Sequence, residues 1–299
     1  MKKKIVVGGA VASTLTASTI TAGLAMASQF AKRVLYREHL NKDDQGHWYE
    51  EMGAIKVKIK NHKGLHLQAY LIEKENAHRT IICLHGLMKS ACSLQKTADY
   101  LQSVFEDDNI LMVDANAHGL SDGYIRGFGY RDVFDLMYFN TYILQKYGQD
   151  HRIIMYGKGM GANTILNTSG LGKLKNVDLI ISEGAFDTVY NYLSYLCQKE
   201  TKVAKFICGP IIRKVIKDEL KNDIKRMNTV DMVKKNQVPT VYVHSKNDSD
   251  VPFQMVFPLY NHDASNKLLF PIKEENLYEL KNREDAYSLS LIEFMNENI

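Results

Sequence analysis

The stretch from Arg152 to Ile165, RIIMYGKGMGANTI, constrains the fold more than any other part of this sequence. Its apolar residues 153–156 predict a short buried strand, and a helix is expected from about Ala162. The three glycines between them predict a turn so sharp that most side chains would collide there. In a turn of this shape the central residue projects its side chain above the edge of the sheet. Here the central residue is Gly159, so no hydroxyl or thiol is presented.

Other apolar runs along the chain are also typical of strands. Residues 55–59 alternate between apolar and charged, as a strand with one wet face does, and residues 66–72 are the expected partner strand. Continuously apolar runs predict strands buried on both faces of a parallel sheet; these are residues 80–84, 110–113, 179–181, 241–243 and 268–270. Helices are expected at 93–104, 130–147, 162–171 and 287–298. The alternation predicts an α/β fold, a mostly parallel sheet with helices on both faces.

The segment 187–236 is too long to be a single crossover helix between two strands. Its apolar residues predict three helices, at 190–197, 203–216 and 224–233. We therefore expect a helical insertion between the strand at 179–181 and the strand at 241–243.

Composition excludes several classes of function. The chain of 299 residues carries 38 basic and 34 acidic residues, and the basic residues show no dense patch with aromatic residues of the kind that nucleic acid needs. The lysine-rich residues 214–235 are interleaved with acids and are typical of a solvated helical face. The four cysteines have no C-x-x-C spacing, so we expect no metal site and no cofactor; a disulfide between two of them stays open.

The N-terminus suggests export or membrane anchoring. Three lysines, Lys2 to Lys4, precede an uncharged stretch at 5–31 that is long enough to cross a bilayer. Ala25-Met26-Ala27 fits the small-residue pattern of a signal-peptide cleavage site, but the uncharged stretch is longer than a usual signal core. We expect an uncleaved transmembrane anchor at 1–31, a linker at 32–51 and a folded domain at 52–299. The bulk of the chain would then lie outside the cytoplasm.

The order of four motifs resembles the α/β-hydrolase family, closest to membrane-anchored bacterial serine aminopeptidases and esterases. His85-Gly86 follows an apolar run, as the family's oxyanion loop does, and Gly157–Gly161 matches the nucleophile elbow G-x-S-x-G apart from its centre. Asp114–Ser121 resembles the loop D-x-R-x-H-G-x-S, with Asn116 in place of the arginine. The turn at 244–252 resembles the one that carries the family's acid.

The resemblance implies a role for particular residues. It places the acid at Asp248, with Asp250 as an alternative, and the degenerate nucleophile at Gly159. Oxyanion and pocket positions would be His85, Gly86, Leu87 and Met160, and the loop that supports them would be held by Asp114, His118, Gly119 and Ser121. The helical insertion at 187–236 would be the family's lid.

Two of the three groups that serine-hydrolase chemistry requires are missing. The nucleophile is replaced by Gly159, and the family's histidine, expected near Glu275 or Asn276, is absent because 271–287 contain no histidine. Loss of either group lowers turnover by on the order of 10⁶-fold. We expect an inactive relative that binds a small-molecule or peptide-like ligand or a partner protein. One alternative is an active hydrolase with relocated groups, such as Cys92 with His85 or His118; another is a membrane-associated scaffold.

Overall fold

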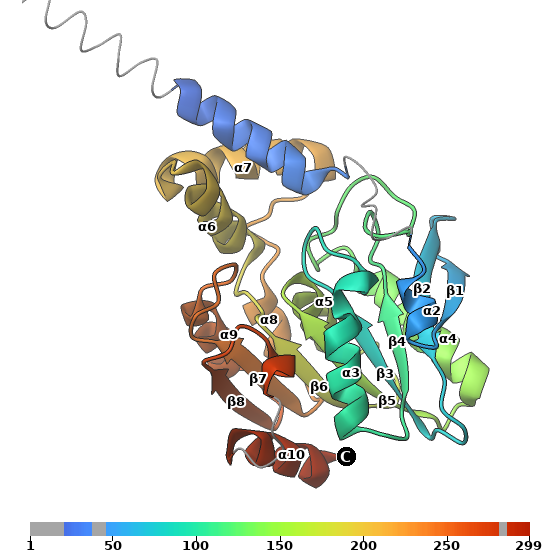
Figure 1. Cartoon of the computed structure of the whole chain (residues 1–299). Helices are drawn as coiled ribbons and strands as arrows, with labels where there is room; N and C mark the ends of the chain where they lie inside the picture. Colours follow the sequence, from blue (N-terminus) through green and yellow to red (C-terminus); the bar gives the residue numbers. More distant parts are fainter. Residues whose placement is uncertain (1–20, 38–45, 281–285) are drawn as a thin grey trace, which may run out of the picture. The chain divides into compact units, whose positions relative to one another are not determined.

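The computed structural model describes residues 21–37, 46–280 and 286–299 (Figure 1). The chain divides into two compact units. The sheet unit consists of Tyr36–Asp187 and Asn228–Ile299, and the helical unit consists of Met1–Leu35 and Thr188–Met227. The candidate site lies in the sheet unit.

The sheet unit is built on an eight-stranded sheet in the order β1-β2-β4-β3-β5-β6-β7-β8. Its first two strands are antiparallel to their neighbours, and every pairing from β4 to β8 is parallel. The strands are β1 (Ile55–Lys60), β2 (His66–Ile72), β3 (Arg79–Leu84), β4 (Asn109–Val113), β5 (Arg152–Lys158), β6 (Val177–Glu183), β7 (Thr240–Ser245) and β8 (Lys267–Ile272). All eight predicted strands are confirmed.

Helices cover both faces of the sheet, as predicted (Figure 1). One face packs against α2 (Trp48–Glu51), η2 (Ala91–Leu94), α3 (Gln95–Val104) and α10 (Ala286–Asn298). The other face packs against α4 (Val133–Tyr147), α5 (Met160–Gly170), α8 (Thr229–Val233) and α9 (Val256–His262). Two short turns, η3 (Phe253–Met255) and η4 (Leu277–Glu279), follow β7 and β8. The central strands bury both faces because their sequences are apolar throughout.

The helical unit contains α6 (Val189–Thr201), α7 (Lys205–Leu220) and a helix over residues 21–35. Figure 1 shows this N-terminal helix, in blue, beside α6 and α7. Phe30 and Val34 on it are buried, and Arg33 forms an ion pair with Glu200 of α6. The helix thus continues past the expected boundary at residue 31, into the expected linker.

The predicted anchor lies largely outside the described residues, since 1–20 belong to none of the three described ranges. Within those ranges, no helix has the length and apolar character needed to cross a bilayer.

The prediction of a third helix in the insertion, at 224–233, is wrong for the first half of that range. Only Thr229–Val233 is helical. The side chain of Asp223 accepts a hydrogen bond from the backbone N–H of Lys225 (3.1 Å), which favours a turn there. The side chain of Asn228 accepts from the N–H of Val230 (3.0 Å) and so begins α8 as its N-cap.

Candidate functional site

The turn between β5 and α5 has the backbone of a nucleophile elbow. Gly159 adopts φ 53° and ψ −116°, which side chains rarely tolerate. Its N–H donates to the carbonyl of Glu183 at the end of β6 (2.8 Å), and its own carbonyl accepts from the N–H of Asn163 (3.1 Å). The turn is therefore fixed on both sides, by the neighbouring strand and by the first turn of α5.

The three glycines of the elbow differ in the space around them. A Cβ on Gly157 would lie 2.5 Å from the backbone nitrogen of Ala162, and one on Gly161 would lie 2.3 Å from the carbonyl oxygen of Leu84. A Cβ on Gly159 would meet only the Cα of Gly86, at 3.7 Å. Close packing of strand and helix thus requires the outer two glycines, whereas a Cβ at position 159 would make only ordinary van der Waals contact.

Asp248 follows β7, where the resemblance places the acid. Its Oδ1 accepts from the backbone N–H groups of Asp250 and Val251, both at 2.8 Å. Gly184 is the first residue after β6, and a Cβ built on it would lie 3.2 Å from Oδ2 of Asp248, so the carboxylate lies close to the end of that strand. The alternative acid, Asp250, is exposed. The carboxylate is thus held by backbone donors at the edge of the sheet that carries the elbow.

His244, the nearest imidazole to that carboxylate, is not placed as a base. It is fully buried in β7, and its Nε2 donates to the carbonyl of Val251 (2.9 Å). The same nitrogen is 3.8 Å from Oδ2 of Asp248. Burial lowers the pKa of His244, so the ring is neutral at pH 7.

Asn276 is one of the two residues, with Glu275, near which the resemblance places the family's histidine. Its Oδ1 accepts a hydrogen bond from Nζ of Lys158, the residue before Gly159. Lys158 also forms an ion pair with the buried carboxylate of Glu183 (3.2 Å). The segment after β8 is therefore tied to the elbow by a lysine–asparagine–glutamate cluster, without an imidazole.

Glu183 is the centre of this cluster. Its Oε2 accepts from the hydroxyl of Tyr156 (2.5 Å), and its Oε1 accepts from the backbone N–H of Leu277 (3.2 Å). Burial, with the nearby Glu183 charge, raises the pKa of Tyr156 well above its ordinary range. The phenol therefore stays a hydrogen-bond donor and gives the carboxylate a third partner besides Leu277 and Lys158.

His85 and His118 use both ring nitrogens on the backbone. Nδ1 of His85 donates to the carbonyl of Gly86 (2.8 Å), and its Nε2 accepts from Ala115 (3.1 Å). His118 donates to the carbonyl of Asn116 (2.9 Å) and accepts from Met88 (3.2 Å). Burial lowers the pKa of His85 to about 4 and that of His118 well below its ordinary value. Both rings are neutral and hold loops; neither has a nitrogen left for a nucleophile.

The loop after β4 is organised around the carboxylate of Asp114. One oxygen accepts from the N–H of Ala91 (2.7 Å), and the other accepts from Leu120 (2.8 Å). Ser121 donates its hydroxyl to the carbonyl of Asp114 (2.6 Å). A Cβ on Gly119 would lie 2.1 Å from this carboxylate, so the loop closes only with glycine at that position.

The remaining pocket positions lie close to the elbow. The Cα of Gly86 faces the elbow at Gly159. Leu87, the next residue in the sequence, is half-buried, and Met160 is buried as the first residue of α5. Cys92 is half-buried in η2, where its Sγ accepts from the side-chain amide of Gln95 (3.2 Å). None of the four cysteines is in a disulfide.

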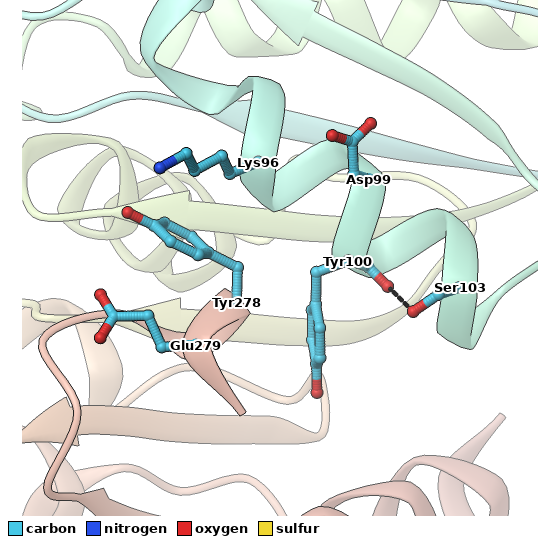
Figure 2. Close-up of a pocket in the computed structure, with 6 residues that line it drawn as sticks. All are labelled: Lys96, Asp99, Tyr100, Ser103, Tyr278 and Glu279. Atoms are coloured by element: carbon cyan, nitrogen blue, oxygen red, sulfur yellow. Dashed lines mark hydrogen bonds between the residues drawn. The ribbon is translucent and has the colours of Figure 1, made fainter. Parts of the chain in front are cut away.

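Sequence reasoning missed a cleft of about 520 Å³ between α3 and η4 (Figure 2). Its lining residues are Lys96, Asp99, Tyr100, Ser103, Tyr278 and Glu279. It borders the elbow cluster, because Asn276 donates to Glu279 (2.5 Å). Glu183 was not predicted as a site residue. The signal that could have indicated it is an acidic residue at the end of an apolar strand, next to the edge of the sheet that carries the elbow.

No protein-family model matches the chain. Among curated proteins it is similar to the uncharacterized protein YqkD of Bacillus subtilis (strain 168), with 23% identity over 265 residues that cover 88% of this chain and 86% of YqkD.

The chain is also similar to solved structures of esterases and hydrolases. Esterase Pf2001 of Pyrococcus furiosus matches with a TM-score of 0.68 and 17% identity, over 89% of this chain and 98% of that one. The alpha/beta hydrolase GrgF of Penicillium sp. sh18 matches with a TM-score of 0.61 and 13% identity, over 82% and 98%. Acetyl xylan esterase 1 of Thermoanaerobacterium sp. JW/SL YS485 matches with a TM-score of 0.58 and 13% identity, over 90% of this chain and 98% of that one. The sheet order, the elbow and these matches together show that the chain has the α/β-hydrolase fold.

Proposed function

We propose that this protein is a ligand-binding member of the α/β-hydrolase fold that does not carry out the serine-hydrolase reaction. The observation that carries the proposal is the elbow itself. Gly159 has a nucleophile's backbone conformation at a position where a Cβ would meet only the Cα of Gly86, and Asn276 would stand in for the base. Acyl transfer needs a nucleophile and a base acting together, so losing both removes the reaction.

The ligand would occupy the space above Gly159 and would be a small acyl or peptide-like molecule. The Cα of Gly86 borders this space, and backbone N–H groups of the loop after β3 and of the first turn of α5 would be the donors to a ligand carbonyl oxygen. The loop that shapes the space is held by Asp114, His85 and His118 through backbone hydrogen bonds. Such a preformed loop supports binding even where chemistry is lost.

The alternative, an active hydrolase with relocated groups, is weakened at both of its proposed bases. A nucleophile such as Cys92 needs an imidazole nitrogen to take its proton. Both nitrogens of His85 and of His118 are engaged with backbone groups in the interior. Ester turnover by the purified protein that is lost on Cys92→Ala would nevertheless establish this alternative.

We further propose that the protein works at the membrane, with its sheet unit outside the cytoplasm. The support is the sequence of the N-terminus, in which three lysines precede an uncharged stretch at 5–31. Protease treatment of intact cells, compared with lysed cells, would test this topology.

The chemical part is tested with a fluorophosphonate probe and short-chain nitrophenyl esters. The wild type, Gly159→Ser and Asn276→His should all fail to react, because each lacks at least one of the two groups. The double variant Gly159→Ser/Asn276→His should gain measurable ester hydrolysis, since it supplies both missing groups in a chain that retains Asp248. Hydrolysis by Gly159→Ser alone would show that another base is in place and would overturn the proposal.

The binding part is tested by titrating short-chain acyl amides and dipeptides while following thermal unfolding. Gly159→Asn should abolish any ligand-induced rise in melting temperature, because its side chain fills the open space. Gly172→Asn is the matched control: Gly172 also has a positive φ, of 64°, and no atom lies within 4 Å of its Cβ position. Equal ligand responses from the two variants would place binding away from the elbow.

A further inference from the structure

The basic residues of this protein are concentrated in the helical unit. That unit holds 14 basic and 4 acidic residues, which leaves 24 basic and 30 acidic residues for the sheet unit. The near-neutral total of +4 therefore hides two units of opposite charge. A strongly cationic unit has a field that attracts anionic partners.

Half of the acidic residues in the helical unit are already paired within it. Glu200 binds Arg33, and Asp223 binds Arg213 with Nε–Oδ1 and Nε–Oδ2 distances of 2.9 and 3.0 Å. These pairs neutralise arginines, not the exposed lysines. Asp218 and Glu219 are the other two acids, both exposed near the C-terminal end of α7.

One exposed stripe on α7 gathers the lysines. Phe206, Pro210, Lys214 and Lys217 recur at helical spacing, and Lys221 follows as the C-cap residue. All five are exposed. The buried residues of α7, Cys208, Ile212, Ile216 and Leu220, recur at the same spacing on another face. The helix therefore packs through its apolar face and presents the lysine stripe outward.

An exposed aromatic residue begins this stripe. Phe206 is 80% exposed, the highest exposure among the large apolar side chains of the described residues. Leu24 and Met26, on the N-terminal helix of the same unit, are each 43% exposed. Lysines beside exposed apolar side chains suit the headgroup region of a bilayer, where cations meet lipid phosphates and apolar groups enter the acyl boundary.

We infer that the helical unit is a peripheral membrane-binding surface, with the α7 stripe docked on a bilayer of anionic phospholipid. Duplex nucleic acid would also attract the lysines, but its phosphate backbone offers no apolar region for Phe206, Leu24 and Met26 to enter. This binding is independent of the ligand site, and it adds a second contact to any anchor formed by the N-terminus.

The test uses the full chain and sedimentation with vesicles of phosphatidylcholine, with and without phosphatidylglycerol. Lys214→Gln/Lys217→Gln/Lys221→Gln should weaken the phosphatidylglycerol-dependent binding by roughly 100-fold at low salt, since each lysine near an anionic surface contributes about fivefold. Added salt should weaken wild-type binding in the same way. Phe206→Ser should weaken binding to vesicles but leave binding to duplex DNA unchanged.

The matched control is Lys60→Gln/Lys63→Gln/Lys173→Gln, which removes the same charge from exposed lysines of the sheet unit. It should bind vesicles like the wild type. Insertion of the N-terminus alone would appear as binding to pure phosphatidylcholine that neither triple variant changes. Equal effects of the two triple variants, or duplex DNA bound more tightly than the anionic vesicles, would overturn the inference.

Discussion

At the scale of single residues, the elbow glycines separate two kinds of constraint. At Gly157 the obstacle is the backbone of Ala162, which cannot move without shifting α5. At Gly159 the obstacle is only the backbone conformation, because the space is open. Position 159 is therefore relaxed as glycine and would be strained by roughly 1–3 kcal/mol as any other residue.

We predict that Gly159→Ala lowers the free energy of unfolding by about 1–3 kcal/mol. Gly157→Ala should lower it by more, on the order of 4 kcal/mol, because its Cβ would overlap backbone atoms of α5. Urea denaturation of the two purified variants measures both values. A smaller loss for Gly157→Ala would contradict the close packing of β5 on α5.

The carboxyl of Asp132 gives a prediction about pH. Burial raises its pKa from 3.8 to about 7; Oδ2 accepts from Gly129, and Oδ1 has no hydrogen-bond partner among the described residues. Between these two pKa values the folded protein holds a proton that the unfolded chain releases, so this group makes stability fall as pH rises.

We therefore expect the free energy of unfolding of Asp132→Asn, minus that of the wild type, to increase by on the order of 4 kcal/mol as pH rises from about 4 to 7. Urea denaturation of both proteins across that range measures the difference. A difference that is constant with pH would show that Asp132 is ionised in the folded protein.

At the scale of elements, α5 is the hub of the sheet unit. It begins at the elbow and packs on β5, and its buried polar side chains bind neighbouring loops. Nδ2 of Asn163 donates to the carbonyl of Phe186 (2.6 Å) and to Oγ1 of Thr229 (2.7 Å), and its Oδ1 accepts from the N–H of Phe186 (3.0 Å). One side chain thus joins α5 to the loop after β6 and to α8.

We predict that Asn163→Ala costs about 3 kcal/mol of stability, because it removes three buried hydrogen bonds, two with the backbone of Phe186 and one with Thr229. Asn167→Ala, one turn further along α5, should cost only about 1 kcal/mol, since Asn167 donates a single bond, to Gly129 (2.9 Å). Thermal and urea unfolding of both variants make the comparison. Equal losses would mean that the network around Asn163 contributes no more than one ordinary hydrogen bond.

At the scale of the whole molecule, the two compact units carry net charges of opposite sign. The helical unit is cationic and the sheet unit anionic, although the basic residues look evenly spread along the sequence. The separation arises because two distant segments, residues 21–35 and 188–227, fold into one unit. A sequence pI of about 8.6 does not describe either unit.

We predict that the protein is retained on a cation-exchange resin at pH 8.6, where its net charge is close to zero. The α7 triple variant Lys214→Gln/Lys217→Gln/Lys221→Gln should elute at clearly lower salt. The sheet-unit triple variant should elute with the wild type, because its lysines belong to the unit whose net charge is negative. Co-elution of all three would show that the resin senses net charge only.

The sequence alone determined the strands, the glycine turn after β5 and the absence of a serine at position 159 and of a histidine after residue 271. Continuous apolar runs, glycines at 157, 159 and 161, and the lack of histidine after residue 271 are local features, and local features can be read from spacing. Only the tertiary structure decided that Asn276 contacts Lys158, that Glu183 is the centre of their cluster, and that the N-terminal helix joins α6 and α7. These contacts join residues far apart in the chain, and which distant side chains meet depends on how the whole chain packs its apolar faces.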